Sequence, residues 1–401
     1  MARVIVVGGG AAGVAAAARL AKMKHSVTLC ERSSGLGGRL RHPGAPATST
    51  LPAALRDLFR KSGRPLEREL ELRPIQTPRR HVFPDGTVLD LPVTGRAEQR
   101  TAIAGVLGSE VADAWTRLVD SCVPLWDLLR RNVLEHPYTG PRALGVSGLR
   151  LLRPGRSLRS IARRALPDAR ARLLLAGTAL GPGADPGSVP AHQVVQAYVE
   201  RTFGRWGNEG GPEALFEVLS RRLAERRVTV LPNTEVTSVQ VIDGVVTGVR
   251  VAGGEPIPAS AVVCTVPVAG LLAHVPAVLR TPAPPKLGSP IGRLEVHDPF
   301  GNEPFEVVRY GEVPDHAPAG ETVRGGPGRL LRAPGRGGAP LPTRTPIRGL
   351  FCAGPPAQPG TGLPYELLGA ALVAESVSGE IDTPTAGATG PPSAAADGGP
   401  A

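Results

Sequence analysis

The sequence of 401 residues has few aromatic side chains, few cysteines and no long apolar run. Aromatic residues make up only 3% of the chain, so the stacking platforms of single-strand nucleic-acid binders are scarce. The four cysteines are far apart and form no CxxC pair, which argues against a zinc cluster, a redox pair or a disulfide framework. Because no stretch of 18 or more apolar residues occurs, we predict no membrane span and expect a cytoplasmic location.

Lysine is also scarce, with four residues, so arginine supplies the other 42 of the 46 basic side chains. The formal net charge of +11 is compatible with binding to nucleic acid or to an anionic surface. Since no zinc-finger or RNA-recognition motif accompanies the charge, we predict no nucleic-acid partner. Arginine is densest over residues 150–172, where leucines interleave with it. This basic amphipathic stretch is either a contact surface for an anionic membrane or a solvated face.

The first forty residues predict a dinucleotide-binding βαβ unit. Residues 3–7 are an apolar, β-branched run typical of a buried parallel strand, and an alanine-rich helix is expected over 11–23. The turn between them has the pattern GxGxxG, and Glu31 follows 18 residues after its last glycine, at the end of a second strand over 26–30. The Glu31 carboxylate can accept hydrogen bonds from ribose hydroxyls and would repel a 2′-phosphate.

Each small residue of the turn has a physical role in this interpretation. Gly8 permits the tight turn, Gly10 lets the backbone approach a pyrophosphate, and Gly13 allows close packing of helix on strand. Ala11 and Ala12 place free backbone N–H groups at the helix start, where the positive potential favours phosphates. This unit alone leaves NAD and FAD open.

A second glycine group favours FAD. After Glu31 and Arg32 come Gly37, Gly38 and Arg39. The glycine pair lets another loop approach the cofactor phosphates, and Arg39 offers them a planar array of donors. The run resembles the ERxxxxGGR signature of the superfamily of FAD-dependent amine oxidases and phytoene desaturases. We therefore predict FAD as the cofactor.

A third element lies near the end of the chain, where a short strand runs into Gly354, a PGTGLP segment follows and a helix begins. It resembles the C-terminal FAD motif of carotenoid desaturases, in which Ala-Gly leads into HPGxGxP, although Gln358 stands where that family has its His. By this resemblance Gly354, Gly362 and Leu363 contact the cofactor.

The resemblance covers residues 3–280 and 343–378. It implies that Val236 meets the adenine end of the cofactor through its backbone. Tyr365 is the aromatic residue best placed near the C-terminal motif and is the catalytic candidate, with a packing role as the alternative. The other catalytic residues stay unknown, and we predict no metal site.

The fold class implied is α/β: an FAD-binding Rossmann-like domain of the glutathione-reductase type with an inserted α+β substrate domain. The cofactor domain is expected to be discontinuous, over residues 1–75, 205–275 and 343–382, and the partly helical substrate domain takes 76–204 and 276–342. Because residues 281–346 are rich in glycine and proline and lack periodicity, we expect loops there and a shortened substrate domain. Residues 383–401 are predicted to be a disordered tail.

These observations predict an FAD-dependent oxidoreductase that desaturates an isoprenoid or other lipophilic substrate by hydride transfer to the flavin. By resemblance it is expected to lie peripherally at the inner face of a membrane. Two alternatives stay open: an amine oxidase or protoporphyrinogen oxidase-like flavoenzyme, and a degenerate FAD-binding protein that serves as a partner. The scarcity of aromatic side chains disfavours the amine oxidase, and the shortened region motivates the degenerate protein. The oligomeric state is left open.

Overall fold

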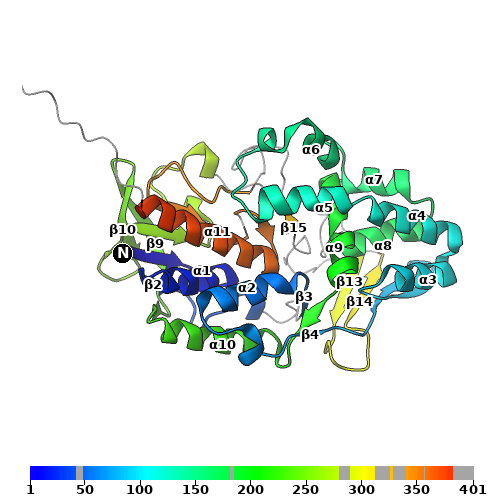
Figure 1. Cartoon of the computed structure of the whole chain (residues 1–401), viewed down its shortest axis with the longest axis horizontal. Helices are drawn as coiled ribbons and strands as arrows, with labels where there is room; N and C mark the ends of the chain where they lie inside the picture. The colour runs from blue at the N-terminus through cyan, green and yellow to red at the C-terminus, as the bar shows by residue number, and fades with distance from the viewer. Residues whose placement is uncertain are drawn as a thin grey trace, which may run out of the picture.

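The computed structural model describes residues 1–41, 48–180, 185–279, 290–311, 326–327, 340–355 and 357–382. A five-stranded parallel sheet carries all three cofactor motifs (Figure 1). Its strands are, in spatial order, β16 (Leu350–Cys352), β12 (Ala261–Cys264), β1 (Arg3–Val7), β2 (Ser26–Cys30) and β8 (Thr229–Leu231). The strands are short apolar runs, as expected of a parallel sheet that is covered on both faces.

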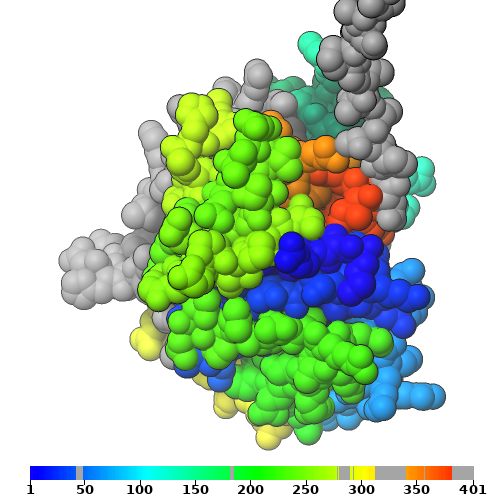
Figure 2. All heavy atoms as spheres, turned by 90° about the vertical axis from the view of Figure 1, so that its left-hand side faces the viewer, coloured from blue at the N-terminus to red at the C-terminus, as the bar shows by residue number. Residues whose placement is uncertain are grey.

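Helices cover one face of this sheet and a small antiparallel sheet covers the other. The helical face has α1 (Ala11–Lys22), α2 (Pro52–Ser62), α10 (Gly211–Glu225) and α11 (Leu363–Asp382), whose apolar residues share one core with the sheet. The opposite face packs on β9 (Val236–Ile242), β10 (Val245–Val251) and β11 (Ile257–Pro258). Figure 2 shows α10, α1 and α11 along the outer surface of this half. The carboxyl ends of the strands point toward the other half of the molecule.

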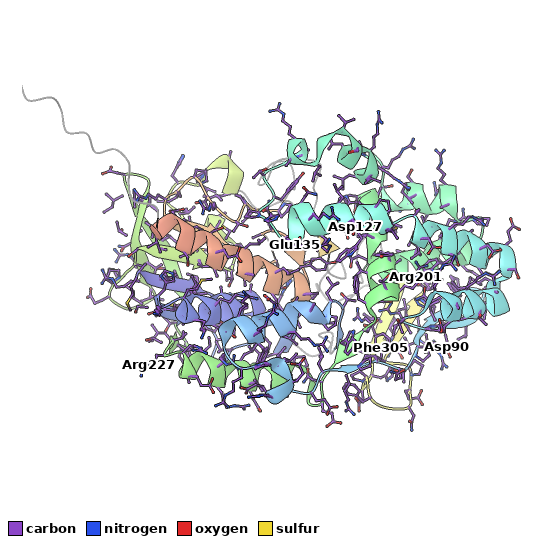
Figure 3. All side chains as sticks on the ribbon, in the orientation of Figure 1. Asp90, Asp127, Glu135, Arg201, Arg227 and Phe305 are labelled. Carbon is purple, nitrogen blue, oxygen red and sulfur yellow. The ribbon has the colours of Figure 1, made fainter. Side chains whose placement is uncertain are left out.

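The other half is largely helical. Its helices are α3 (Arg96–Leu107), α4 (Ser109–Asp120), α5 (Val123–Leu129), α6 (Gly145–Leu152), α7 (Leu158–Ala165), α8 (Ala169–Ala179) and α9 (Val195–Phe203). They pack on a sheet of order β13 (Ile291–Val296), β14 (Glu306–Tyr310), β5 (Arg79–Val82) and β6 (Val88–Leu91) around a separate core. Arg201 and Phe305 lie in this half and Arg227 in the other, as Figure 3 shows.

Short strands join the two halves. A three-stranded sheet has the order β3 (Thr48–Ser49), β7 (Trp206–Gly207) and β4 (Arg73–Pro74), and β15 (Gly326–Pro327) pairs with β17 (Gly360–Thr361). The first passage of the chain into the helical half and its first return therefore run side by side. Across the described residues, none of the helices has the length and apolar character that a membrane crossing requires.

The local predictions agree with most of these elements. The strands predicted at 3–7 and 26–30 have the expected bounds, and the helix predicted over 11–23 forms as α1. The helix predicted after the PGTGLP segment forms as α11, from Leu363 to Asp382. The predicted tail over 383–401 lies outside the described residues.

One expectation is wrong. Residues 281–346 are not all loop, because β13 and β14 form there; β14 pairs with both β13 and β5, and burying Val308 and Tyr310 outweighs the weak local pattern. The arginine-dense stretch 150–172 covers the end of α6, all of α7 and the start of α8. Breaks at Pro154 and Pro167 separate these helices, as proline removes a backbone donor.

Candidate cofactor site

The predicted glycine turn lies between β1 and α1 and is held by close backbone contacts. Gly8 has a φ of +100°, which a residue with a Cβ adopts only with strain. A Cβ on Gly13 would lie 1.9 Å from the carbonyl oxygen of Gly8, so the helix packs on the turn at a distance that only glycine permits. The Thr265 hydroxyl donates to the carbonyl of Val7 at 2.8 Å and fixes the turn from the neighbouring strand.

Gly10 differs from the other two glycines of the motif. It is the N-cap of α1, with φ −71° and ψ −176°, which any residue can adopt. A Cβ built on it would meet no described heavy atom within 4 Å. Ala11 and Ala12 follow as the first buried residues of α1. The helix start therefore faces open space with its free backbone N–H groups, as a phosphate-binding turn requires.

Glu31 is buried at the end of β2, with 7% of its surface exposed. One carboxylate oxygen accepts a hydrogen bond from the Gly9 backbone N–H at 2.6 Å, and the other accepts from Ser33 at 2.8 Å. Each oxygen has a second lone pair, so the carboxylate retains capacity for ribose hydroxyls. Arg32, next in the sequence, is exposed.

The second glycine group lies directly against the first. The Gly37 N–H donates to the Gly9 carbonyl at 2.8 Å, and a Cβ on Gly38 would lie 3.2 Å from the Cα of Gly10. The Arg39 side chain is 56% exposed and its guanidinium lies 3.4 Å from the carboxylate of Glu366, in the first turn of α11. The loop thus approaches the start of α1 as the sequence predicts.

The third motif reaches the same place from the end of the chain. Gly354, with φ +81°, would place a Cβ 3.5 Å from that of Ala12 and 3.0 Å from the Thr265 carbonyl. Gly362, with φ +92°, precedes α11, and Leu363 is the first residue of that helix. The N-termini of α1 and α11 therefore both lie in this half, with Gly354 at the start of α1.

Val236 opens β9 and is buried in the same apolar cluster as Cys30, the residue before Glu31. The backbone links the two segments, because the Thr234 N–H donates to the Glu31 carbonyl at 2.8 Å. Val236 is therefore beside the end of β2, where the resemblance places the adenine end.

Tyr365 is buried in α11, with 1% of its surface exposed. Its hydroxyl accepts a hydrogen bond from the Gln196 side-chain amide of α9 at 3.0 Å. Burial raises the pKa of Tyr365 to about 12, although the Gln196 hydrogen bond acts in the opposite direction. The hydroxyl stays protonated at neutral pH and bridges the cofactor half to the helical half.

Gln358 has a role that the sequence analysis did not assign. It is 1% exposed, its side-chain amide donates to the Tyr138 carbonyl at 2.6 Å, and its side-chain oxygen accepts from the Tyr138 N–H at 3.0 Å. The segment before Gly362 is therefore tied to the chain that follows α5. The departure from the desaturase pattern at this position was the only signal in the sequence.

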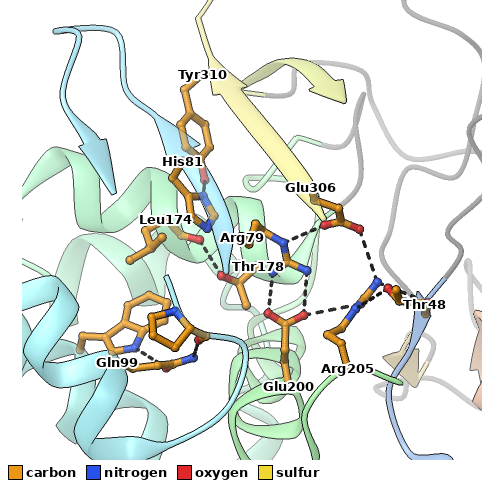
Figure 4. A network of polar contacts seen from close by, with 12 residues as sticks. Thr48, Arg79, His81, Gln99, Leu174, Thr178, Glu200, Arg205, Glu306 and Tyr310 are labelled. Carbon is orange, nitrogen blue, oxygen red and sulfur yellow. Dashed lines mark hydrogen bonds and ion pairs between the residues drawn. The ribbon is translucent and has the colours of Figure 1, made fainter. Parts of the chain in front are cut away.

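A buried group of four charged side chains, also missed by the sequence analysis, links β5, α9, β14 and β7 (Figure 4). The fully buried Arg79 guanidinium donates to Glu200 at 2.5 and 2.9 Å and to Glu306 at 2.7 Å. Burial alone would lower the pKa of Arg79, but the two carboxylates raise it overall. The fourth member, Arg205, lies 3.4 Å from Glu306 and 3.5 Å from Glu200. The group is neutral in sum, and each charge has an opposite neighbour.

Arg205 extends this group toward the cofactor half. Its Nε donates to the Thr48 hydroxyl at 3.0 Å, and Thr48 begins β3 after the second glycine loop. The network therefore fixes the position of the short joining sheet relative to the helical half.

The residues brought together at the start of α1 fit FAD. The open space at Gly10 and the close approach of Gly38 provide a phosphate site. The buried Glu31 carboxylate, hydrogen-bonded to Gly9, provides a ribose site next to it. Gly9 and Thr265, which hold these segments together, were not singled out by the sequence analysis.

Comparisons with known proteins support this interpretation. The family model described as "FAD dependent oxidoreductase" matches residues 3–291. A hydroxyneurosporene desaturase of Cereibacter sphaeroides is 30% identical over 285 residues, which are 68% of this chain and 57% of the relative. A neurosporene-forming phytoene desaturase of the same species is 30% identical over 273 residues, 65% of this chain and 52% of the relative. The chain thus spans little more than half the length of these curated relatives.

A solved structure supports the fold. An oxidoreductase from Methanosarcina mazei superposes with a TM-score of 0.57 at 16% identity, over 93% of this chain and all of the other. At this identity the likeness shows the fold alone, and it extends to the helical half as well as to the parallel sheet.

Proposed function

The chain belongs to the family of FAD-dependent oxidoreductases, and from that premise we propose that it desaturates a lipophilic isoprenoid by hydride transfer to FAD. The single observation that carries the proposal is the convergence of three separate motifs on the start of α1, in a chain whose curated relatives are carotenoid desaturases.

Desaturation requires the loss of a hydride and a proton from adjacent carbons as the double bond forms. FAD, when bound, supplies the acceptor for two electrons. The chain supplies binding at the Gly10 turn and at Glu31, and it excludes water by packing Tyr365 and Gln196 together between the halves. Such a reaction requires orientation of the substrate and an apolar surrounding more than acid–base groups. Separately, the described residues contain no cluster of three or more metal-ligating side chains.

The test is a single-turnover experiment with purified protein reconstituted with FAD. Anaerobic mixing with an acyclic C40 polyene in neutral liposomes should bleach the flavin absorbance and extend the conjugation of the polyene. Parallel mixtures with a primary amine and with protoporphyrinogen distinguish the two other flavoenzyme classes. Glu31→Ala, which removes the ribose acceptor, is the control for cofactor-dependent bleaching. Flavin that binds and bleaches with dithionite but with none of the polyenes would refute the desaturase proposal.

We also propose that the side of the molecule formed by α6 contacts an anionic lipid surface. Val146 is 68% exposed on this helix, and four exposed arginines lie in the helix or within a few residues of its ends. They are Arg142, Arg150, Arg153 and Arg156. An exposed apolar side chain among cations is the pattern of an interfacial helix.

Co-sedimentation with liposomes tests this contact. Anionic vesicles should retain the protein at low salt and release it at high salt, because the attraction is screened. Val146→Asp should weaken retention, whereas Val245→Asp, at an exposed valine of β10 in the other half, should not. Equal retention by neutral and anionic vesicles would exclude the electrostatic contact.

A further inference from the structure

A cavity of about 230 Å³ lies between α7, α8 and the residue before β13. Its wall is apolar, with Leu158 and Ala162 from α7, Leu173 and Ala176 from α8, and two prolines. None of the lining residues belongs to the three cofactor motifs. The cavity is therefore separate from the site that the proposed oxidation uses.

Three arginines complete the lining: Arg159, Arg163 and Arg172. Arg159 is already paired with Asp185, and Arg172 donates to the Pro167 carbonyl at 3.2 Å. Arg163 is exposed and forms no ion pair with any residue that the structure describes. Three guanidinium groups against one carboxylate leave an excess of positive charge beside an apolar wall.

We propose that this cavity binds an anionic amphiphile: one alkyl or isoprenyl chain that ends in a carboxylate or a phosphate. The chain lies on the apolar wall, and the head group meets Arg163 and Arg172, whose planar donor arrays match both kinds of oxyanion. The volume is below the roughly 300–1,000 Å³ of pockets that enclose a drug-sized ligand, so the cavity takes a short chain or one chain end.

The two parts of the lining predict separable contributions to affinity. Each CH₂ that enters the cavity lowers the dissociation constant about fourfold, because its apolar surface is buried. An exposed arginine contributes about two- to fivefold, since solvent weakens its attraction. An inorganic anion uses only the arginines and a neutral alcohol uses only the wall, so both should bind more weakly than the amphiphile.

Titration calorimetry of the FAD-loaded protein tests the site with octyl phosphate, octanoate, octanol and inorganic phosphate, all below micelle concentrations. We expect octyl phosphate and octanoate to bind and the other two to bind at least fivefold more weakly. If octyl phosphate binds more tightly than octanoate, the site favours a phosphate head group, as in a phospholipid. If octanoate binds more tightly, it favours the carboxylate of a fatty acid.

Three variants locate the binding. Ala162→Leu fills the cavity and should abolish binding of every chain-bearing ligand. Arg163→Glu should weaken both anions at least fivefold and leave octanol unchanged. Arg164→Glu is the matched control, because Arg164 is the exposed neighbour on α7 outside the lining, and should leave all affinities within twofold.

The outcome is decided by these comparisons. The proposal is overturned if Arg163→Glu and Arg164→Glu lose the same amount of affinity for the anions. It is also overturned if Ala162→Leu binds the chain-bearing ligands unchanged, or if octanol binds as tightly as octyl phosphate. Flavin content and thermal unfolding, measured on every variant, establish that the protein is folded. Because flavin bleaching is assayed separately, failure of this site is distinguishable from failure of the proposed oxidation.

Discussion

Gly10 and Gly13 belong to the same sequence motif but have opposite surroundings, and this contrast gives a sharp prediction. Gly10→Ala adds a methyl group to space in which no described atom lies within 4 Å, at a backbone conformation that alanine adopts freely. Gly13→Ala places the same methyl group 1.9 Å from the carbonyl oxygen of Gly8, where only backbone movement could make room. The first variant should fold and the second should not.

The expected magnitudes for Gly10→Ala are small for folding and large for FAD. Alanine is a poorer N-cap than glycine, at a cost of about 1 kcal/mol, while its smaller backbone entropy in the unfolded chain offsets about 0.4–1 kcal/mol. Stability should therefore change by less than about 1 kcal/mol. The methyl group would displace a cofactor phosphate, and a backbone N–H would lose its hydrogen bond to this charged acceptor. Such a bond contributes about 1.5–3 kcal/mol, so its loss weakens FAD binding about 10- to 150-fold.

The assay is titration of the apoprotein with FAD by flavin fluorescence, together with urea unfolding of the same samples. Gly105→Ala in α3 is the matched control, because its added methyl group also meets no described atom, and it is remote from the cofactor motifs. It should bind FAD like the unaltered protein. If Gly10→Ala is folded and binds FAD as tightly as Gly105→Ala does, the phosphate is not at the start of α1 and the assignment of the site is refuted.

Three further outcomes are expected. Arg79→Met leaves two buried carboxylates with one remaining cation and should lower the free energy of unfolding by about 3–5 kcal/mol; a loss below 1 kcal/mol in urea unfolding would contradict the network. Tyr365→Phe removes one hydrogen bond, so it should cost about 1 kcal/mol of stability with turnover within fivefold, whereas a hundredfold loss of turnover would make the tyrosine catalytic. The hydrogen bond from the Arg170 side chain lowers the pKa of Asp168, so the stabilisation by this carboxylate is present above about pH 4 and is lost as the pH falls further. Asp168→Asn should therefore make the free energy of unfolding fall less steeply on the acid side. An unchanged dependence of unfolding free energy on pH would exclude this origin.

The βαβ unit at the start of the chain was predictable because each of its signals is local. A β-branched run, a glycine turn and an acid at a fixed distance describe one supersecondary unit, and β1, α1 and β2 form as the pattern predicts. The convergence of Gly38 and Gly354 on that unit could be expected only through the family resemblance, since residues more than 300 positions apart meet there.

The remainder depends on contacts that no local pattern encodes. Arg79 and Glu306 are 227 positions apart, and an arginine in a short strand has the same appearance whether it is buried in a network or solvated. The two strands β13 and β14 form in a region of low periodicity because β14 has partners on both sides. Composition alone therefore predicted loops at residues that pairing in the sheet holds as strands.

The position that departs from the desaturase pattern shows how such a contact changes the interpretation of a residue. An amide side chain has a donor and an acceptor side by side, so Gln358 pairs with both the N–H and the C=O of Tyr138. The two nitrogens of a histidine ring point in divergent directions and could not meet both groups of one residue. Glutamine at this position therefore ties the segment before α11 to the helical half. Together with the Tyr365–Gln196 contact, it gives the two halves a fixed relation near the start of α11.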